Sequence, residues 1–400
     1  MFRAIIRYSN KRFGLLKRLK EVTDKRIKAQ ISTAEVAVAI FSLQIANQGS
    51  LHNFSQSVKT PSVSTIARSA DTMDLDKIRE VGLEIYKKAR KSKMLTPYLS
   101  QLIGIVDGKE ITTSQYCKCG HCKRRKLKDK DGKLKYQYYH QVTVFILATN
   151  DFSFTLDIEP ILPGEGEVRS SYRLIERVLA NYPKAFSIII GDGLYLNGKI
   201  FKLLKTHHKK TIAVLKEERR QLFSEANKLS LLAEPQVYRQ GKTTYRVWDH
   251  AISGCWEGYG DDVRVIVSEE VTRKRVHAKD GGGWEDIEEV ANWMWVTNMV
   301  KDGKDLGDLK NMVRLCHSRW HIENRCFRET ASMWNMEHIY RHSENAIMVF
   351  LLFLSMALNI FNIFRKRNVK DKKIKTKLKL MQHIRADFTI TPSPLPPIPI

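Results

Sequence analysis

The chain contains little cysteine and few acidic residues for its size. Six cysteines among 400 residues are too few and too unevenly placed for a disulfide framework, so we expect reduced thiols. Aspartate and glutamate number 43 against 68 lysines and arginines, which leaves a formal net charge of +25. A polyanionic partner best offsets that self-repulsion, so nucleic acid is the leading expectation. A basic surface that is merely solvated is the alternative.

The chain also lacks the marks of secretion. Its first 20 residues are basic but contain no apolar stretch of about 7–15 residues and no small-residue cleavage site, so we expect a cytoplasmic protein. One long apolar run, residues 346–364, is almost long enough to cross a bilayer and is followed by three basic residues. Because Ser355, Asn359 and Asn362 interrupt it, we favour a helix buried in a large core over a membrane anchor.

The pattern along the chain predicts several folded parts. Residues 1–98 have helical periodicity, with Ser32 and either Asp74 or Asp76 in position to cap helices. Three short β-type runs then follow one another between 102 and 158, and after Pro163 strands alternate with helices. This order predicts an α/β fold: a mixed sheet flanked by helices, with parallel pairing in part of it.

The second half departs from this pattern and then returns to it. Residues 217–297 are mostly β-type, with a glycine turn at 281–283 and five of the seven tryptophans, which indicates an insertion. A long helical stretch follows, and the last residues are basic and then proline-rich, so we expect no core there. The predicted segments are a helical DNA-binding or dimerisation region (1–98), the first half of the core (99–216), a β-rich insertion (217–297), the C-terminal core helices (298–365) and a tail (366–400).

Three acidic residues stand where phosphodiester chemistry would need them. Asp107 follows an apolar strand and precedes a glycine, and Asp192 follows another apolar strand within a Gly-Asp-Gly sequence. A helical sequence at 319–329, RWHIENRCFRE, places Arg319 and Glu323 on one face. Carboxylates on rigid elements are what two divalent cations require. An acid at a strand end is, however, more often a turn residue when taken alone.

In this order and context the motifs resemble those of bacterial insertion-sequence transposases of the DDE type, over about residues 31–364. The resemblance implies an RNase H-like core with a β-rich insertion, and it assigns Asp107, Asp192 and Glu323 as catalytic ligands of two Mg²⁺ or Mn²⁺. It also implies that the enzyme cleaves double-stranded DNA at transposon ends and transfers the 3′-OH to target DNA. A homodimer on DNA, associated with the nucleoid, is the corresponding expectation.

The helix motif departs from the family pattern at two positions. Cys316 stands where a tyrosine is usual and Thr330 where a lysine is usual. The resemblance implies DNA contacts for Arg319, and Arg325 or Arg328 are candidates to replace the missing positive charge. The tryptophans of the insertion, Trp293, Trp295 and Trp248, are candidates to stack on a flipped base, Trp293 first among them. The alternative is that they fill the core of a β domain.

A cluster of cysteines follows the first acidic residue. Cys117, Cys119 and Cys122, with His140 rather than His121 as the fourth ligand, would complete a tetrahedral structural zinc site. Reduced surface cysteines in a basic loop are the alternative. That loop, residues 123–135, contains eight basic residues, of which Lys123, Arg124 and Arg125 are candidates to contact DNA phosphates.

Two other classes of function fit part of the sequence. A zinc-stabilised DNA-binding protein without catalysis would explain the charge and the cysteines but leaves the three acids unexplained. A related RNase H-like nuclease, such as a junction resolvase, would use two metals but would need neither the β insertion nor strand transfer.

Overall fold

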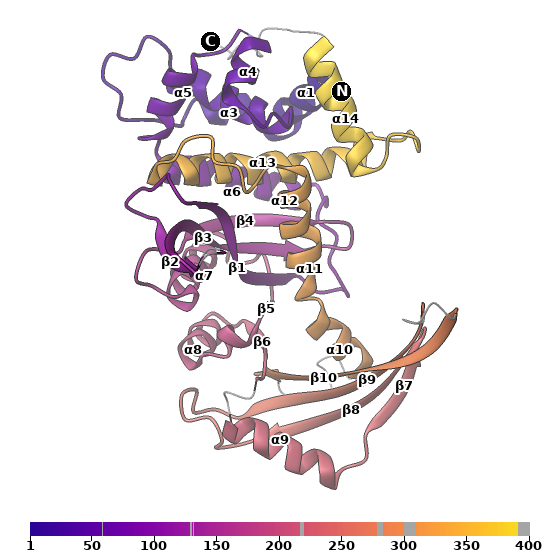
Figure 1. The fold of residues 1–400 in the computed structure, drawn as a ribbon. Helices are drawn as coiled ribbons and strands as arrows, with labels where there is room; N and C mark the ends of the chain where they lie inside the picture. Colours follow the sequence, from indigo (N-terminus) through magenta and orange to yellow (C-terminus); the bar gives the residue numbers. More distant parts are fainter. Residues whose placement is uncertain are drawn as a thin grey trace. The chain divides into compact units, whose positions relative to one another are not determined.

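The structure is a computed structural model that describes residues 1–57, 59–128, 130, 132–216, 220–277, 283–299 and 309–390. The chain forms two compact units. Unit 1 comprises Met1–Pro97, Val106–Pro183 and His321–Ile400, and unit 2 comprises Tyr98–Ile105 and Lys184–Trp320. Figure 1 shows their strands and helices. The fold is mixed α/β, as the sequence predicts.

The strands of unit 1 form a largely antiparallel sheet. β3 (Leu134–Ala148) pairs antiparallel with β2 (Lys123–Lys128) through its first part and with β4 (Ser153–Pro160) through its last part. β3 also pairs with β1 (Ile103–Ser114), which begins in unit 2 and continues here. Every residue of the run 142–148 is buried. Both faces of that run are therefore shielded from water, which explains why it is continuously apolar rather than alternating.

Helices cover this sheet and build the rest of unit 1. α7 packs against β3 and β4, while α13 packs against β4 and against α3, α5 and α6. Ser32 caps α3 within a capping box with Glu35, and Asp74 caps α6, as two of the sequence signals predict. The helical elements are α1 (Phe2–Phe13), α2 (Leu15–Leu19), α3 (Thr33–Ile45), α4 (Leu51–Ser57), α5 (Val63–Ala70), α6 (Leu75–Lys91), α7 (Glu167–Asn181), α11 (Trp320–Ile322, which begins in unit 2), η2 (Glu323–Phe327), α12 (Arg328–Met333), α13 (Glu344–Asn368) and α14 (Lys377–Ile390).

The apolar run at 346–364 forms most of α13. The helix is long and apolar enough to cross a membrane, but 94% of its apolar window is buried within the structure, as we expected of a core helix. One of its polar residues has a structural role: Asn359 accepts the backbone N–H of Thr155 at 2.9 Å and donates to the Thr155 carbonyl at 2.8 Å. A buried amide that satisfies both backbone groups of a strand residue costs little to bury.

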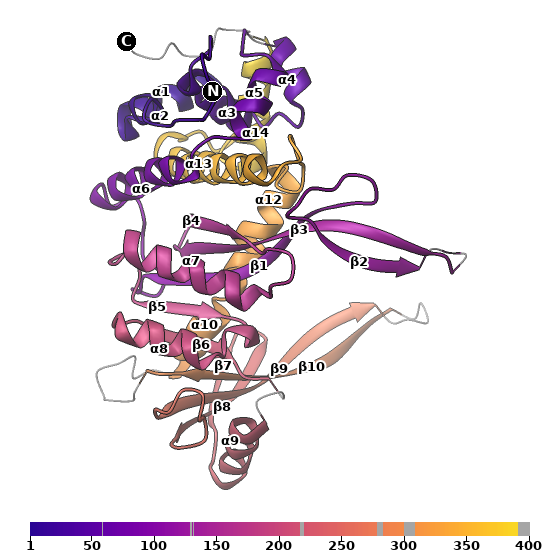
Figure 2. The same ribbon diagram turned by 90° about the vertical axis from the view of Figure 1, so that its left-hand side faces the viewer.

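Two expectations for unit 1 were wrong. Part of the tail does contribute to a core: α14 buries Leu380, Ile384 and Phe388, and the Phe388 ring lies 5.0 Å from that of Phe2. The proline-rich end, 391–400, lies outside the described residues. The basic segment expected to be a loop instead pairs as β2 with residues 134–139 of β3. We call β2 and residues 134–139 the basic hairpin; Figure 2 shows it extending from the strands of unit 1.

Unit 2 contains the parallel part of the sheet and the insertion. The first residues of β1 pair parallel with β5, and β5 pairs parallel with β6, with α8 in the connection. β6 then pairs antiparallel with β10, and the order continues through β9, β8 and β7. Of the glycine turn, residues 281 and 282 lie outside the described residues. The elements are β5 (Ile188–Gly191), η1 (Gly193–Tyr195), α8 (Gly198–Thr206), β6 (Lys210–Val214), α9 (Arg220–Leu232), β7 (Gln236–Gln240), β8 (Thr243–Ile252), β9 (Val263–His277), β10 (Trp284–Thr297) and α10 (Leu309–His317).

Candidate active site and Cys-His cluster

Asp107 lies within β1, directly after the buried apolar residues that begin the strand. Its Oδ1 accepts the backbone N–H of Gly108 at 2.9 Å, and the side chain is half-buried. A Cβ at Gly108 would clash with the Glu167 carboxylate. Glycine at this position therefore lets a second acidic side chain approach the backbone next to Asp107.

Asp192 stands at the end of β5 in unit 2. Its Oδ1 accepts the backbone N–H of Leu194 at 2.8 Å, so it also caps the short η1 turn. The Nζ of Lys216 lies 3.9 Å from Asp192 Oδ2. Packing favours glycine at position 191, because a Cβ there would meet the Tyr195 ring at 2.5 Å, and at position 193 a Cβ would displace the flexible Lys216 side chain. The Gly-Asp-Gly sequence thus holds the carboxylate at a tight strand-to-turn junction.

The register of two strands relates the positions of the aspartates along the chain. In unit 2, β1 and β5 are parallel and Ile105 pairs with Ile190. Asp107 and Asp192 each follow their paired isoleucine by two residues. Along the chain, Asp107 within β1 and Asp192 after β5 therefore have the same separation from this pair, which neither sequence context alone revealed.

Glu323 is exposed and begins the π-helical turn η2 in unit 1. Single π turns inside α-helices are uncommon and occur frequently at functional sites. Burial, together with the charge of Arg325, lowers the pKa of the preceding His321 to about 4, so that imidazole is neutral at pH 7. The oxygen ligands offered by Glu323 and the two aspartates suit Mg²⁺ or Mn²⁺.

The two departures from the family's helix motif are buried. Cys316 is 1% exposed, and Thr330 is 4% exposed with its hydroxyl donating to the Cys326 carbonyl at 2.7 Å. Neither side chain reaches the surface. Of the arginine candidates, Arg325 donates to the carbonyls of Thr149 and Asn150, both at 3.1 Å.

The other two arginine candidates differ in exposure. Arg328 is exposed, and Arg319 is half-buried. A contact between Arg328 and DNA would therefore need no rearrangement of the helix, whereas Arg325 already holds the turn after β3.

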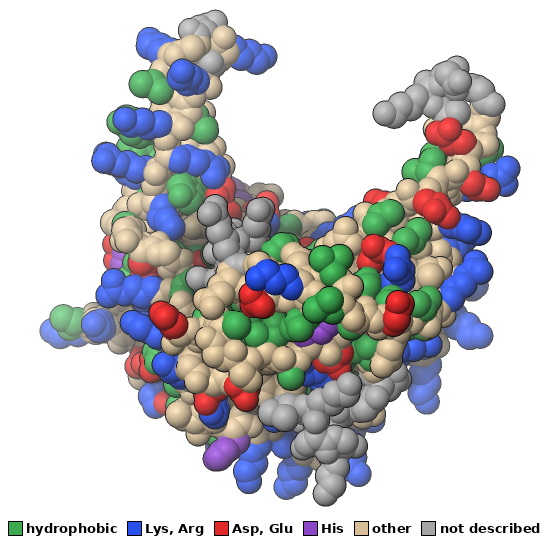
Figure 3. Space-filling model, turned by 90° about the horizontal axis from the view of Figure 1, so that it is seen from below, with side chains coloured by type: hydrophobic (Ala, Val, Ile, Leu, Met, Phe, Trp, Pro, Cys, Tyr) green, Lys and Arg blue, Asp and Glu red, His purple; other side chains and the backbone are tan. Residues whose placement is uncertain are grey.

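The basic hairpin presents cations along its length (Figure 3). Arg124 is exposed, and its guanidinium lies 5.5 Å from the centre of the Tyr136 ring. Arg125 instead makes two bonds of 3.0 Å to Glu110, and Lys123 donates to Gln141 at 3.0 Å. Of the three predicted phosphate contacts, Arg125 is therefore ion-paired, whereas Lys123 is hydrogen-bonded to neutral oxygens and Arg124 is both exposed and stacked near a neutral ring.

Tryptophans gather around a histidine in unit 2. The imidazole of His317 lies 4.9 Å from the Trp295 ring and 5.0 Å from the Trp320 ring, and the Trp293 ring lies 5.6 Å away. Its Nε2 is 2.6 Å from Glu270 Oε1. This pair was missed by sequence reasoning, because the two residues are 47 positions apart.

The three candidate tryptophans differ in their surroundings. Trp295 is 2% exposed and belongs to the core, whereas Trp293 is half-buried and stacks on it. Trp248 donates its indole N–H to the Ala233 carbonyl at 2.8 Å. Trp293 therefore remains the best placed of the three to meet a base, as a prediction.

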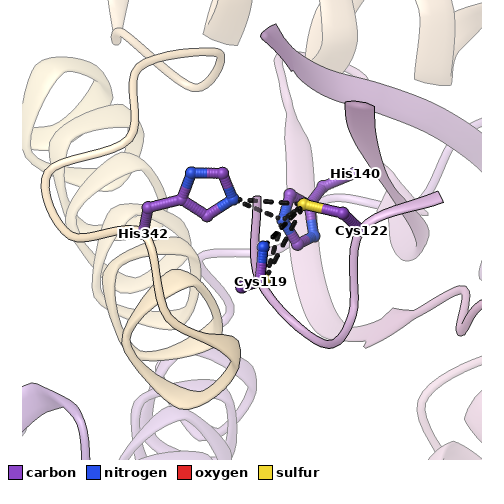
Figure 4. Close-up of side chains that lie close together, drawn as sticks. All are labelled: Cys119, Cys122, His140 and His342. Atoms are coloured by element: carbon purple, nitrogen blue, oxygen red, sulfur yellow. Dashed lines mark hydrogen bonds between the residues drawn. The ribbon is translucent and has the colours of Figure 1, made fainter. Parts of the chain in front are cut away.

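Two cysteines and two histidines of unit 1 point toward one another (Figure 4). The ligand atoms of Cys119, Cys122, His140 and His342, the Cys-His cluster, all lie within 4.8 Å of one another. The expectation that Cys117 belongs to the set was wrong: it is exposed, and among the described residues His342 takes its place. Sequence reasoning missed His342 because it lies 220 positions beyond Cys122.

The surroundings of the cluster decide the protonation of its members. Burial, followed by the charges of His342 and His121, lowers the pKa of His140 to about 4, so its imidazole is neutral at pH 7. Burial also raises the pKa of the Cys119 thiol to about 11. A thiolate there is costly unless a cation accompanies it. His121 pairs instead with Glu344, with Nε2 3.3 Å from its carboxylate.

The family model described as Transposase DDE domain matches residues 99–360, which is more than half of the chain and contains all three candidate carboxylates and the whole Cys-His cluster. No curated protein matches the chain.

Proposed function

The chain belongs to the family of transposase DDE domains, and we propose that it cleaves double-stranded DNA at transposon ends and transfers the freed 3′-OH to target DNA. The family itself implies a DNA partner, DNA cutting of the transposase type and the use of a divalent metal. The two reaction steps, the residue assignments and a homodimer working on the nucleoid are parts of the proposal.

One observation carries the residue assignment. Asp107, within β1, and Asp192, after β5, each follow by two residues one member of the parallel pair Ile105–Ile190, which supports the assignment. Acids placed after strands on a rigid sheet are suited to hold cations in a fixed geometry. Glu323, on the π turn η2, supplies the third carboxylate of the proposed set.

In the proposal, Asp107, Asp192 and Glu323 hold Mg²⁺ or Mn²⁺, which would activate water for attack on the phosphodiester and stabilise the leaving 3′-oxygen. The chain's own cations bind the substrate. Arg124 and its neighbours in the basic hairpin contact phosphates, and Arg328 does so next to the third acid. Trp293 is proposed to stack on a base near the cleaved end.

The test uses purified full-length protein and plasmid DNA that carries the native flanking sequences, with Mg²⁺ or with EDTA. Wild type is compared with Glu323→Gln, Asp192→Asn and the matched control Glu285→Gln, which changes an exposed acid on β10. We expect metal-dependent cuts at the flanks, lost in the first two variants and retained in the control.

Other outcomes would overturn parts of the proposal. Binding to the flanks without cleavage by wild type would favour a DNA-binding protein without catalysis. Cleavage by Glu323→Gln or Asp192→Asn at the wild-type rate would refute the carboxylate assignment. Cleavage without any joining of the 3′ ends to target DNA would favour a nuclease that lacks strand transfer.

A further inference from the structure

The Cys-His cluster has the donors of a structural zinc site. We propose that Cys119, Cys122, His140 and His342 bind one Zn²⁺ that closes the base of the basic hairpin and fastens it to the segment entering α13. Two thiolates and two imidazoles are a frequent closed ligand set for zinc, and they suit it far better than they suit Mg²⁺. The site is therefore separate in its chemistry from the three carboxylates.

The distances match a tetrahedron around one ion. With Zn–S near 2.3 Å and Zn–N near 2.05 Å, the edges would be about 3.8 Å for S–S, about 3.6 Å for S–N and about 3.3 Å for N–N. The two sulfurs, of Cys119 and Cys122, are 3.8 Å apart. Three sulfur-to-Nε2 distances are 3.4, 3.2 and 3.2 Å, and the Nε2 atoms of His140 and His342 are 3.1 Å apart. These five edges fit one zinc ion with shifts of a few tenths of an ångström, and the sixth, from Cys119 Sγ to His342 Nε2, lies within 4.8 Å.

The backbone around the cysteines is arranged to support thiolates. The N–H of Cys119 donates to Cys122 Sγ at 3.2 Å, and the N–H of Cys122 donates to the Cys119 carbonyl at 3.1 Å. The His121 N–H is also hydrogen-bonded to the Cys119 sulfur. Hydrogen bonds that orient ligands and share their negative charge are a regular part of metal sites.

The segment that supplies His342 is held in place from both sides. Asp71 accepts hydrogen bonds from Arg341, at 2.8 Å from its Nη2, and from Ser343. Glu344, the first residue of α13, pairs with His121. The two chain segments therefore meet through contacts that do not involve the metal, and His342 is preorganised as a ligand.

Two ligands directly flank the basic hairpin. Cys122 precedes Lys123, the first residue of β2, and His140 follows Tyr139, and these two neighbours are paired with each other across the strands. An ion bound by Cys122 and His140 would join the strands where the hairpin begins. A two-stranded hairpin is only marginally stable alone. The bound ion would therefore fix the direction in which the basic hairpin presents its lysine and arginine side chains.

The test measures zinc in the full-length protein without DNA, so its result is independent of cleavage activity. Protein purified without chelators should contain about one zinc per chain by mass spectrometry of the metal. X-ray absorption of wild type should show two sulfur and two nitrogen neighbours. His342→Ala and Cys122→Ser should lose zinc, whereas Cys117→Ser, the matched control, and Glu323→Gln should keep it.

Several results would overturn the proposal. Absence of stoichiometric zinc, or a disulfide between Cys119 and Cys122 in the purified protein, would do so. Three sulfur neighbours, or zinc lost in Cys117→Ser and kept in His342→Ala, would restore Cys117 as a ligand in place of His342. The absorption measurement needs no variant, so a variant that misfolds does not prevent a decision.

Discussion

The imidazole Nε2 of His342 lies 3.2 Å from the Cys122 sulfur, although 220 positions separate the two residues. In the proposed zinc site this contact ties the basic hairpin to the segment entering α13. We therefore predict that zinc removal increases hydrogen exchange of backbone amides in β2 and in residues 341–346, because their shared support is lost.

Exchange measured by mass spectrometry, with and without a zinc chelator, checks this prediction. Cys117→Ser should behave as wild type, and His342→Ala should exchange rapidly even without chelator. Equal protection of both segments in wild type before and after zinc removal would contradict it.

The basic hairpin should contribute to DNA affinity through its charge. Arg124→Ala should weaken binding to DNA of any sequence and reduce the slope of log K against log salt by about 1, since one phosphate contact is lost. Arg273→Ala on β9 is the matched control, because its guanidinium already pairs with Glu288 at 3.0 Å. Fluorescence anisotropy over a salt series checks this, and an unchanged slope for Arg124→Ala would argue against the contact.

A network of buried charges should stabilise unit 1. Asp157, with a side chain 3% exposed, lies 2.6 Å from Arg177 Nε and 3.1 Å from Arg79 Nε. We expect Asp157→Asn to lower the free energy of unfolding by about 3 kcal/mol, because a buried charge is removed from between two half-buried guanidinium groups. Asp76→Asn, which changes an 81% exposed partner of Arg79, should cost less than about 1 kcal/mol. Urea unfolding of both variants measures the difference, and equal effects would contradict the prediction.

Acid should weaken the same network through Glu165. Hydrogen bonds from Arg173, at 2.7 and 2.8 Å, hold the pKa of that carboxyl below its usual value. A lowered folded-state pKa stabilises the fold above the unfolded value of about 4.3 and ceases to do so as pH falls through the folded value. Wild type should therefore exceed Glu165→Gln in unfolding free energy at pH 7, and the difference should shrink below about pH 4. If the difference in unfolding free energy between wild type and Glu165→Gln did not depend on pH, the ionised form of Glu165 would not be the source of the stabilisation.

Much of the fold was predictable because its signals are local. Ser32 and Asp74 cap helices through bonds to residues two or three positions away, and the apolar runs before Asp107 and Asp192 do form β-strands, although β1 continues past Asp107 to Ser114. The sequence-based prediction was wrong where an element forms through contacts with residues distant in the chain. The basic segment after Cys122 is so highly charged that its sequence resembles a loop. It forms a strand because it pairs with residues 134–139, and this pairing is not visible in its own composition. In the tail, the residues that α14 buries gain a core from the N-terminal helices, as the contacts of Phe388 with Phe2 and Phe54 show.

The sequence by itself determined the class of the fold, because periodicity and local contexts specify the order of strands and helices. Its net charge indicated a nucleic-acid partner, and the proposed order of the three carboxylates came from the resemblance of their motifs to those of DDE transposases. Tertiary structure alone decided which residues meet. It paired Ile105 with Ile190, the residues two positions before Asp107 and Asp192, and it brought His342 to Cys119, Cys122 and His140 while Cys117 is exposed. The physical reason is that a ligand set depends on distances in space. His342 lies 220 positions beyond Cys122, and the sequence around neither residue indicates that they are close in the fold.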